Sequence, residues 1–234
     1  MGLGSNTAII AALLGWGAAA FAQGVAGPLE FQPASEAVSC LRDEATRRCT
    51  LQSEGDLKYP RSAVRLDKLH GTVLVRMDFT GPSQPPQATL LFSEGGPAFT
   101  EAVGRYLANS RLPCLAETQQ VTSVEAFQFR MEESPALSLP DMSLAEFIPL
   151  IDGIEKESVL FDFTAMGCPF DLRLRSYRPW ASNVVREAGS GDPRRGEFMA
   201  WLSGVVLKLP AQARGRLIGQ EMGLSVPCTQ LDLR

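Results

Sequence analysis

The side chains that could do chemistry are few, and their spacing matches no common catalytic pattern. The single histidine, His70, precedes a glycine, where we expect a solvated turn residue. The sequence contains no Gly-x-Ser-x-Gly nucleophile elbow, zinc-protease helix or phosphate-binding loop. Segment 189–193 is rich in glycine but lacks the lysine of a phosphate loop, and nothing places acidic pairs such as Asp152 and Glu155 in one cleft. We therefore predict a protein that is not an enzyme, with no catalytic residue and no cofactor.

Five cysteines offer disulfide, redox or metal chemistry. None forms a Cys-x-x-Cys pair. A zinc site would need closely spaced cysteines or a second histidine, and the sequence has neither. We therefore predict structural disulfides and no metal site. Cys40 and Cys49 flank a short polar segment that a bond would close into a small loop. Cys168 follows a predicted turn and Cys228 lies in the predicted last strand, so a bond would tie the chain end to a neighbouring hairpin. Cys114 would then be the odd one, although the sequence alone does not fix the connectivity.

The first 22 residues indicate export. They carry no charged side chain, and their apolar run ends in Ala20-Phe21-Ala22, the small-x-small pattern of a signal-peptide cleavage site. The run is shorter than the roughly 20 residues of a spanning helix, which leaves a membrane anchor as the alternative. The usual Lys or Arg near the start is missing, which an upstream start would explain. We predict a soluble periplasmic protein that begins at Gln23, in a space where disulfides persist.

The composition leaves room for ordinary cores and argues against nucleic acid. Apolar residues make up 45% of the chain, whereas a net charge of -4 and a pI near 5.2 provide no basic face for a phosphate backbone. The mature length suggests one large domain or two small ones. We predict an α+β fold of two small domains in tandem, each a short antiparallel sheet packed with helices. The predicted segments are a signal peptide (1–22), an extended lead-in (23–50), a first domain (51–132), a linker (133–141) and a second domain (142–234).

The first domain is predicted to follow the order helix, strand, strand, helix, strand. Pro60 suits the first turn of a short helix, and residues 71–80 alternate apolar and polar side chains as a half-buried strand does. A turn rich in proline leads to a returning strand over 87–93, and residues 121–131 form the third strand. An amphipathic helix that Pro113 ends is predicted from the spacing of Phe99, Ala102, Val103, Tyr106 and Leu107.

The second domain shows the same order more faintly, which suggests a duplication. The alternative is that any two α+β segments look alike at this level. Two short echoes favour the duplication: Met77-Asp-Phe-Thr against Phe161-Asp-Phe-Thr, and Arg111-Leu-Pro against Lys208-Leu-Pro. The predicted elements are a helix over 142–154, a hairpin of strands 158–164 and 170–176, a helix that Pro210 ends, a helix over 214–222 and a strand over 226–233.

Residues 59–131 resemble the TonB carboxyl-terminal domain. The pattern of that family begins Tyr-Pro-x-x-Ala, which matches at Tyr59, continues Gly-x-Val-x-Val, which matches at Gly71, and has Ser-x-Gly before a helix, which matches at Ser93. The family's helix ends in Trp-x-Phe-x-Pro, whereas this chain keeps Pro113 and lacks the aromatic residues. We also expect neither the membrane anchor nor the long spacer of the energy-transducing members. The resemblance therefore implies the domain rather than energy transduction.

Members of that family bind a partner segment, commonly by adding it as a strand to a sheet edge. The resemblance implies that strand 121–131 is this edge and that its partner-binding residues are Val121, Ser123, Glu125, Phe127 and Phe129. An internal strand without a free edge is the alternative. The implied partner is another envelope protein, such as an outer-membrane receptor, with membrane contact only through it and no nucleic acid.

Two other functions stay open at this point. A secreted hydrolase or hydrolase inhibitor would need a deep polar pocket that no motif marks. A true TonB energy transducer would need an anchor encoded upstream. An adaptor would instead show a free sheet edge or an apolar groove.

Overall fold

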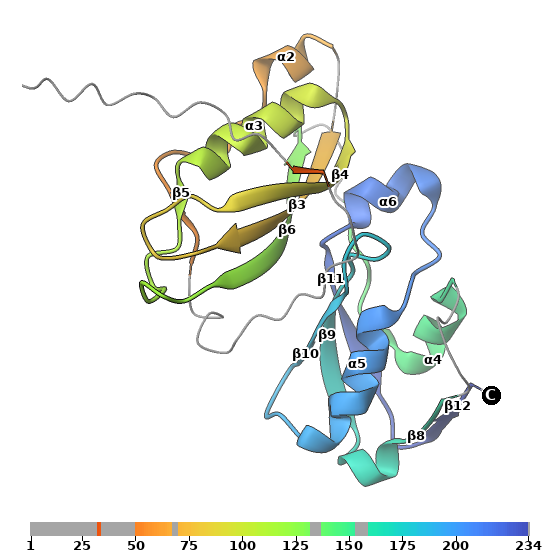
Figure 1. The fold of residues 1–234 in the computed structure, drawn as a ribbon. Helices are drawn as coiled ribbons and strands as arrows, with labels where there is room; N and C mark the ends of the chain where they lie inside the picture. Colours follow the sequence, from red (N-terminus) through yellow and green to blue (C-terminus); the bar gives the residue numbers. More distant parts are fainter. Residues whose placement is uncertain (1–31, 34–49, 67–69, 132–136, 153–158, 234) are drawn as a thin grey trace, which may run out of the picture.

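The computed structural model describes residues 32–33, 50–66, 70–131, 137–152 and 159–233. It is a mixed α+β fold with two four-stranded sheets, each packed with helices on one face (Figure 1). We call residues 50–131 the first half and residues 137–233 the second half. The predicted linker lies partly outside the described residues.

The first sheet has β3 at its centre. Strand β3 pairs antiparallel with β4 on one side and with β6 on the other, and β1 lies parallel to the outer side of β4. Helix α3 joins β4 to β6, so the predicted order of helices and strands is confirmed. The elements are β1 (Gln32–Pro33), β2 (Gln52–Ser53), α2 (Arg61–Val64), β3 (His70–Phe79), β4 (Gln87–Glu94), α3 (Pro97–Ala108), β5 (Ser110–Arg111) and β6 (Val121–Arg130).

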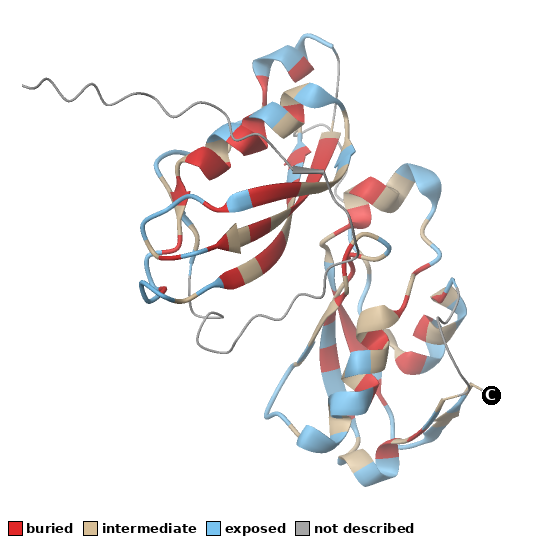
Figure 2. Ribbon diagram, viewed as in Figure 1, coloured by how far each residue is buried: buried red, intermediate tan, exposed pale blue. Residues whose placement is uncertain are grey.

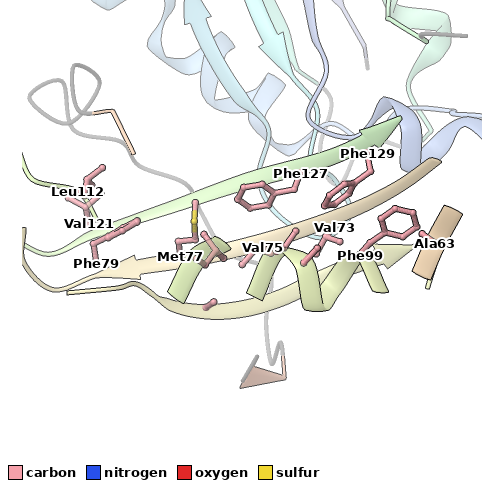
Figure 3. Packing of buried hydrophobic residues seen from close by; sticks show 14 of the residues in the cluster. Ala63, Val73, Val75, Met77, Phe79, Phe99, Leu112, Val121, Phe127 and Phe129 are labelled. Carbon is pink, nitrogen blue, oxygen red and sulfur yellow. The ribbon is translucent and has the colours of Figure 1, made fainter. Parts of the chain in front are cut away.

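Period-two alternation in β3 builds the first core. Val73, Val75, Met77 and Phe79 point toward α3 and are buried, as Figure 3 shows. The prediction of a half-buried strand is wrong, however, because Leu74 on the opposite face is also fully buried. The reason is that the second half covers that face (Figure 2).

Helix α3 ends earlier than the sequence predicts. Its last residue is Ala108, five residues before Pro113. The chain instead forms β5, which pairs antiparallel with β2, and the Ser110 hydroxyl donates to the Tyr106 carbonyl at 2.8 Å. Side-chain hydrogen bonding and strand pairing therefore end this helix before proline does.

The glycines that carry the family resemblance make room for one aromatic ring. The Phe99 ring lies over Gly71 and Gly95, and a Cβ at Gly95 would come within 2.7 Å of that ring. Tyr59 meets the Phe99 ring edge-on at 5.4 Å and the Phe129 ring at 6.2 Å. Burial raises the pKa of the Tyr59 hydroxyl. The motif spacing thus has a packing reason, because these positions meet in the core between α3 and the sheet.

The second sheet has the strand order β10-β9-β11-β7, and a separate two-stranded sheet pairs β8 with β12. The strands are β7 (Met142–Ser143), β8 (Leu160–Asp162), β9 (Phe170–Arg175), β10 (Val184–Glu187), β11 (Glu221–Val226) and β12 (Gln230–Asp232). The helices are α4 (Leu144–Phe147), α5 (Gly196–Gly204) and α6 (Ala211–Leu217), with short 3-10 turns η1 (Ile148–Leu150), η2 (Phe163–Met166) and η3 (Pro193–Arg195).

The predicted hairpin of the second half is wrong. Strand β8 does not pair with β9, because the turn η2 and the left-handed Gly167 separate them and β8 pairs with β12 instead. Strand β9 pairs instead with β10 on one side and β11 on the other, and β10 was not predicted. The predicted last strand 226–233 contains β12 but only the final residue of β11, and the predicted helix 214–222 ends at Leu217, before β11 begins. The helix predicted over 142–154 begins only at Leu144, after β7.

Both sheets nevertheless share one topology. In each, the first strand is central, the second strand flanks it, a helix crosses over, and the third strand pairs on the other side. The first sheet follows this path as β3, β4, α3 and β6, and the second follows it as β9, β10, α5 and β11. The echo Arg111/Lys208 fits this alignment, since both residues follow the crossover helix. The echo Met77/Phe161 does not, because Phe161 lies in β8.

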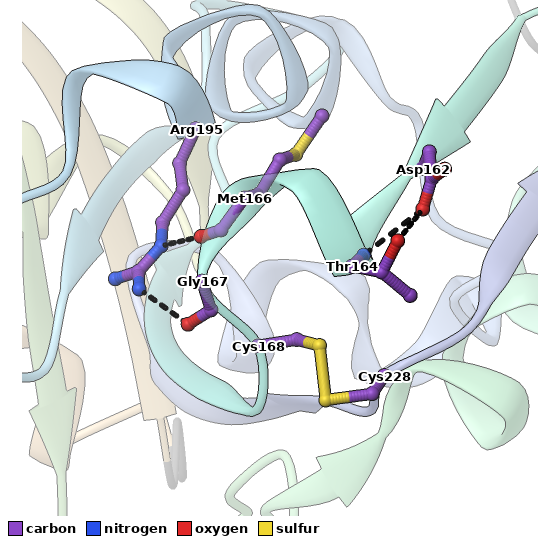
Figure 4. The surroundings of a disulfide bond; sticks show 7 residues. All are labelled: Asp162, Thr164, Met166, Gly167, Cys168, Arg195 and Cys228. Atoms are coloured by element: carbon purple, nitrogen blue, oxygen red, sulfur yellow. Dashed lines mark hydrogen bonds between the residues drawn. A yellow bond between two sulfur atoms is a disulfide. The ribbon is translucent and has the colours of Figure 1, made fainter.

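One disulfide links Cys168 to Cys228, which confirms that predicted pair (Figure 4). Cys228 lies between β11 and β12 rather than in a strand. The turn before Cys168 is held by Arg195, which donates to the Met166 and Gly167 carbonyls at 2.9 Å and pairs with Glu187 at 2.6 Å. Cys114 is also disulfide-bonded, so the prediction that it is left over is wrong. The predicted Cys40–Cys49 bond lies outside the described residues.

Acid is expected to weaken the second half through Asp192. Hydrogen bonds from the Arg194 side chain lower the pKa of this carboxyl from 3.8 to about 2. A lowered folded-state pKa contributes stability that is present above the ordinary value and is lost as the pH falls toward 2. The free energy of unfolding should fall over this interval in urea titrations. The Asp192→Asn variant should show a shallower fall, and an equal slope would contradict this role.

Candidate protein-interaction edge

Strand β6 ends the first sheet. All ten of its residues pair with β3, from Val121 opposite Phe79 to Arg130 opposite His70. In the part of the chain that the structure describes, no strand pairs with its other side. An edge strand presents unpaired N–H and C=O groups along that side, which can accept a further strand.

The side chains of the five residues predicted to form the partner-binding edge are largely engaged within the protein. Val121, Phe127 and Phe129 are buried in the core beneath α3, and Ser123 is buried on the same face. Only Glu125 is partly exposed, and its carboxylate lies 3.9 Å from the Arg175 guanidinium. Four of these side chains are therefore buried in the protein, and Glu125 lies beside Arg175.

The opposite face of β6 packs on the second half. The Gln128 amide donates to the carbonyl of Ile218 at 2.8 Å, and Gln220 donates to the Gln128 side-chain oxygen at 2.7 Å. A Cβ at Gly219 would overlap the Cβ of Ala126. Because side chains on both faces of β6 are engaged, its main-chain edge is the part left for binding.

The apolar contact that joins the two halves, which we call the seam, was missed by the sequence prediction. It is a separate buried cluster whose members are Leu74, Val124, Tyr177, Ala181 and Ile218. The Trp180 ring also packs on Phe92 of β4, with 4.4 Å between ring centroids. No local signal marks these residues, because Leu74 and Val124 lie on the strand faces opposite α3, and Tyr177, Ala181 and Ile218 lie outside the helices and strands.

Charged groups cluster beside the seam. Arg175 lies between Glu125 and Glu221, with the latter at 3.4 Å. Burial by itself would lower the pKa of Arg175, but the neighbouring Tyr177, Glu125 and Glu221 raise it overall. Arg175 therefore stays charged and connects β9, β11 and β6.

The candidate metal and acid-base residues are not brought together. Among the residues that the structure describes, no three His, Cys, Asp or Glu side chains form a group that could hold a metal ion. His70 begins β3 rather than lying in a turn, because β3 extends one residue further than predicted. Of the acidic pair Asp152 and Glu155, only Asp152 lies in the described part. Residues 189–192 form a loop, and Pro193 begins η3.

Within the described ranges, no helix is long and apolar enough to cross a membrane. No family model matches the chain, and neither a curated protein nor a solved structure matches it.

Proposed function

We propose that this protein is an exported, non-enzymatic binding protein of the cell envelope, and that its first half is a TonB carboxyl-terminal-like domain. It binds an extended segment of another envelope protein as an added strand on β6. The observation that carries the proposal is the position of β6, a ten-residue strand that is paired on one side only within the described residues. Main-chain bonds supply affinity in such complexes, which suits an edge whose side chains are engaged elsewhere.

The structure already contains two examples of short added strands. Strand β1 pairs parallel with β4, and β7 pairs parallel with β11. Both outer strands run parallel to the edge they cover, so the same orientation is proposed for the partner on β6. The shared topology of the two sheets supports a second, divergent domain of the same type, and the disulfides support an oxidising compartment.

The test is site-specific photo-crosslinking in the native host. A photoreactive amino acid is placed at Thr122 and at Arg130, near the two ends of β6. Matched controls carry it at Arg105 on the exposed side of α3 and at Gln87 on the opposite strand β4. We expect an envelope protein to be captured from both β6 positions and from neither control. Capture of the same protein from all four positions, or from none, would contradict strand addition at β6.

A further inference from the structure

The edge of the second sheet that corresponds to β6 is already filled by the chain itself. Strand β11 follows α5 and pairs with β9, just as β6 follows α3 and pairs with β3. On the outer side of β11 lies β7, in which Met142 is opposite Leu224 and Ser143 is opposite Ser225. Asp141, the residue before β7, also contacts the outer side of β11, but through its side chain.

The Asp141 carboxylate takes the place of a strand carbonyl. The Gly223 N–H donates to Asp141 Oδ1 at 2.6 Å, so this N–H points away from β9 and belongs to the outer edge. A Cβ at position 223 would lie 2.7 Å from Asp141 Cγ, which means that the glycine makes room for the carboxylate. Arg173 of β9 lies 3.4 Å from the same carboxylate and stabilises its charge.

The segment that pairs with β11 is short because the chain leaves the sheet and enters α4 directly after β7. Ser143 caps α4, with its N–H donating to Glu146 Oε2 at 2.8 Å and its hydroxyl accepting from the Glu146 N–H. Leu144 and Phe147 of α4 then enter the second core. The helix therefore anchors the carboxyl-terminal end of residues 141–143. Leu139, which precedes these residues in the chain, packs against the same core.

We propose that residues 141–143 are a built-in plug that fills a strand-accepting edge on β11, the counterpart of the β6 edge. The plug combines a two-residue parallel strand with a carboxylate that satisfies one outward N–H. Among the residues that the structure describes, this leaves β6 open and the corresponding edge of β11 filled. The equivalence to a partner site rests on the proposed function, whereas the plug itself rests only on these contacts.

The first part of the test opens the plug and measures hydrogen exchange in the full chain. The Asp141→Ala substitution removes the carboxylate, and Met142→Pro removes a backbone donor from β7. We expect the amides of Gly223 and Ser225 to exchange roughly tenfold faster or more, since edge amides lose their acceptors. Amides of Leu172 and Leu174 in β9 should keep their protection, which shows that the sheet is still folded. The Asp141→Asn variant keeps an acceptor oxygen and should show a smaller change at Gly223.

The second part supplies the plug in trans. A synthetic peptide of residues 137–143 is added at millimolar concentration to the opened variant and to the unchanged chain. The peptide should restore slow exchange at Gly223 and Ser225 in the opened variant and change nothing in the unchanged chain, whose own plug has a large effective concentration. A peptide with alanine in place of its aspartate should restore little.

Two results would overturn the plug. One is unchanged exchange at Gly223 after both substitutions, and the other is an opened edge that the peptide does not protect. Neither readout involves β6 or an outside partner, so failure of the proposed function would leave this result untouched, and the reverse also holds.

Discussion

Replacing Gly219 with alanine is expected to separate the two halves and to lower the free energy of unfolding by about 2–4 kcal/mol. Gly219 has φ +75°, a left-handed conformation that costs any residue with a Cβ roughly 1 kcal/mol. The added Cβ would also overlap the Cβ of Ala126, which is fixed to the backbone of β6 and cannot rotate away. Both costs fall on the seam, and the Gly219 N–H bond to the Ser176 carbonyl holds the residue there.

A double-mutant cycle separates the two causes. Ala126→Gly removes the opposing methyl, so the Gly219→Ala/Ala126→Gly chain should recover the part of the loss that comes from overlap and keep the part from φ. Urea unfolding followed by the fluorescence of Trp180, which packs at the seam, provides the measurement. Additive losses in the double variant would show that Gly219 does not contact β6 in this way.

Gly71→Ala is expected to destabilise the first half by about 1–3 kcal/mol, because it forces a methyl into the Phe99 ring. The ring cannot move aside easily, since Gly95, Tyr59 and Phe129 surround it. The backbone of Gly71 is ordinary strand, so the effect would be purely steric. Thermal unfolding of the single variant measures the loss.

Two further variants make this a specific test. Gly189→Ala adds the same methyl where no atom lies within 4 Å, and it should be neutral to within about 0.5 kcal/mol. Phe99→Leu shrinks the opposing side chain, so adding Gly71→Ala to it should cost less than Gly71→Ala alone. If Gly71→Ala were as harmless as Gly189→Ala, the packing explanation of the spacing of Gly71 and Gly95 would be wrong.

The sequence predicted the first half well because its signals are local. Alternation in β3, helical spacing in α3 and the proline-containing turn between β3 and β4 each depend on neighbouring residues. The end of α3 was misplaced because pairing of β5 with the distant β2 decides it. Pro113 was the helix-ending signal in the sequence, but the pairing of β5 with β2 ends α3 before the chain reaches it.

The second half was harder because its pairings skip neighbours. Strand β8 looks like the start of a hairpin, yet it pairs with β12 near the chain end. Strand β10 has only four residues and follows a long connection that contains Tyr177 and Trp180, which serve the seam. Their role depends on the other half, so no pattern within the segment could reveal it.

The sequence predicted that β6 is a strand, but it did not predict which of its side chains are exposed. Alternation in β6 shows which side chains share a face, and it cannot show that a second half covers the other face. Nor does the alternation say which face is inward, so Phe127 and Phe129 looked available although they are core residues beneath α3. Asp141 and Gly223, which close the corresponding edge of the second sheet, are far apart in sequence and carry no motif.

The seam has a practical consequence for anyone who wishes to study the first half alone. A chain that stops at residue 131 would leave Leu74, Val124 and Phe92 without their cover, as an apolar patch next to the open edge of β6. An exposed apolar patch beside unpaired backbone groups favours aggregation over soluble expression. The first half would need either its natural neighbour or polar replacements on that face to stay in solution.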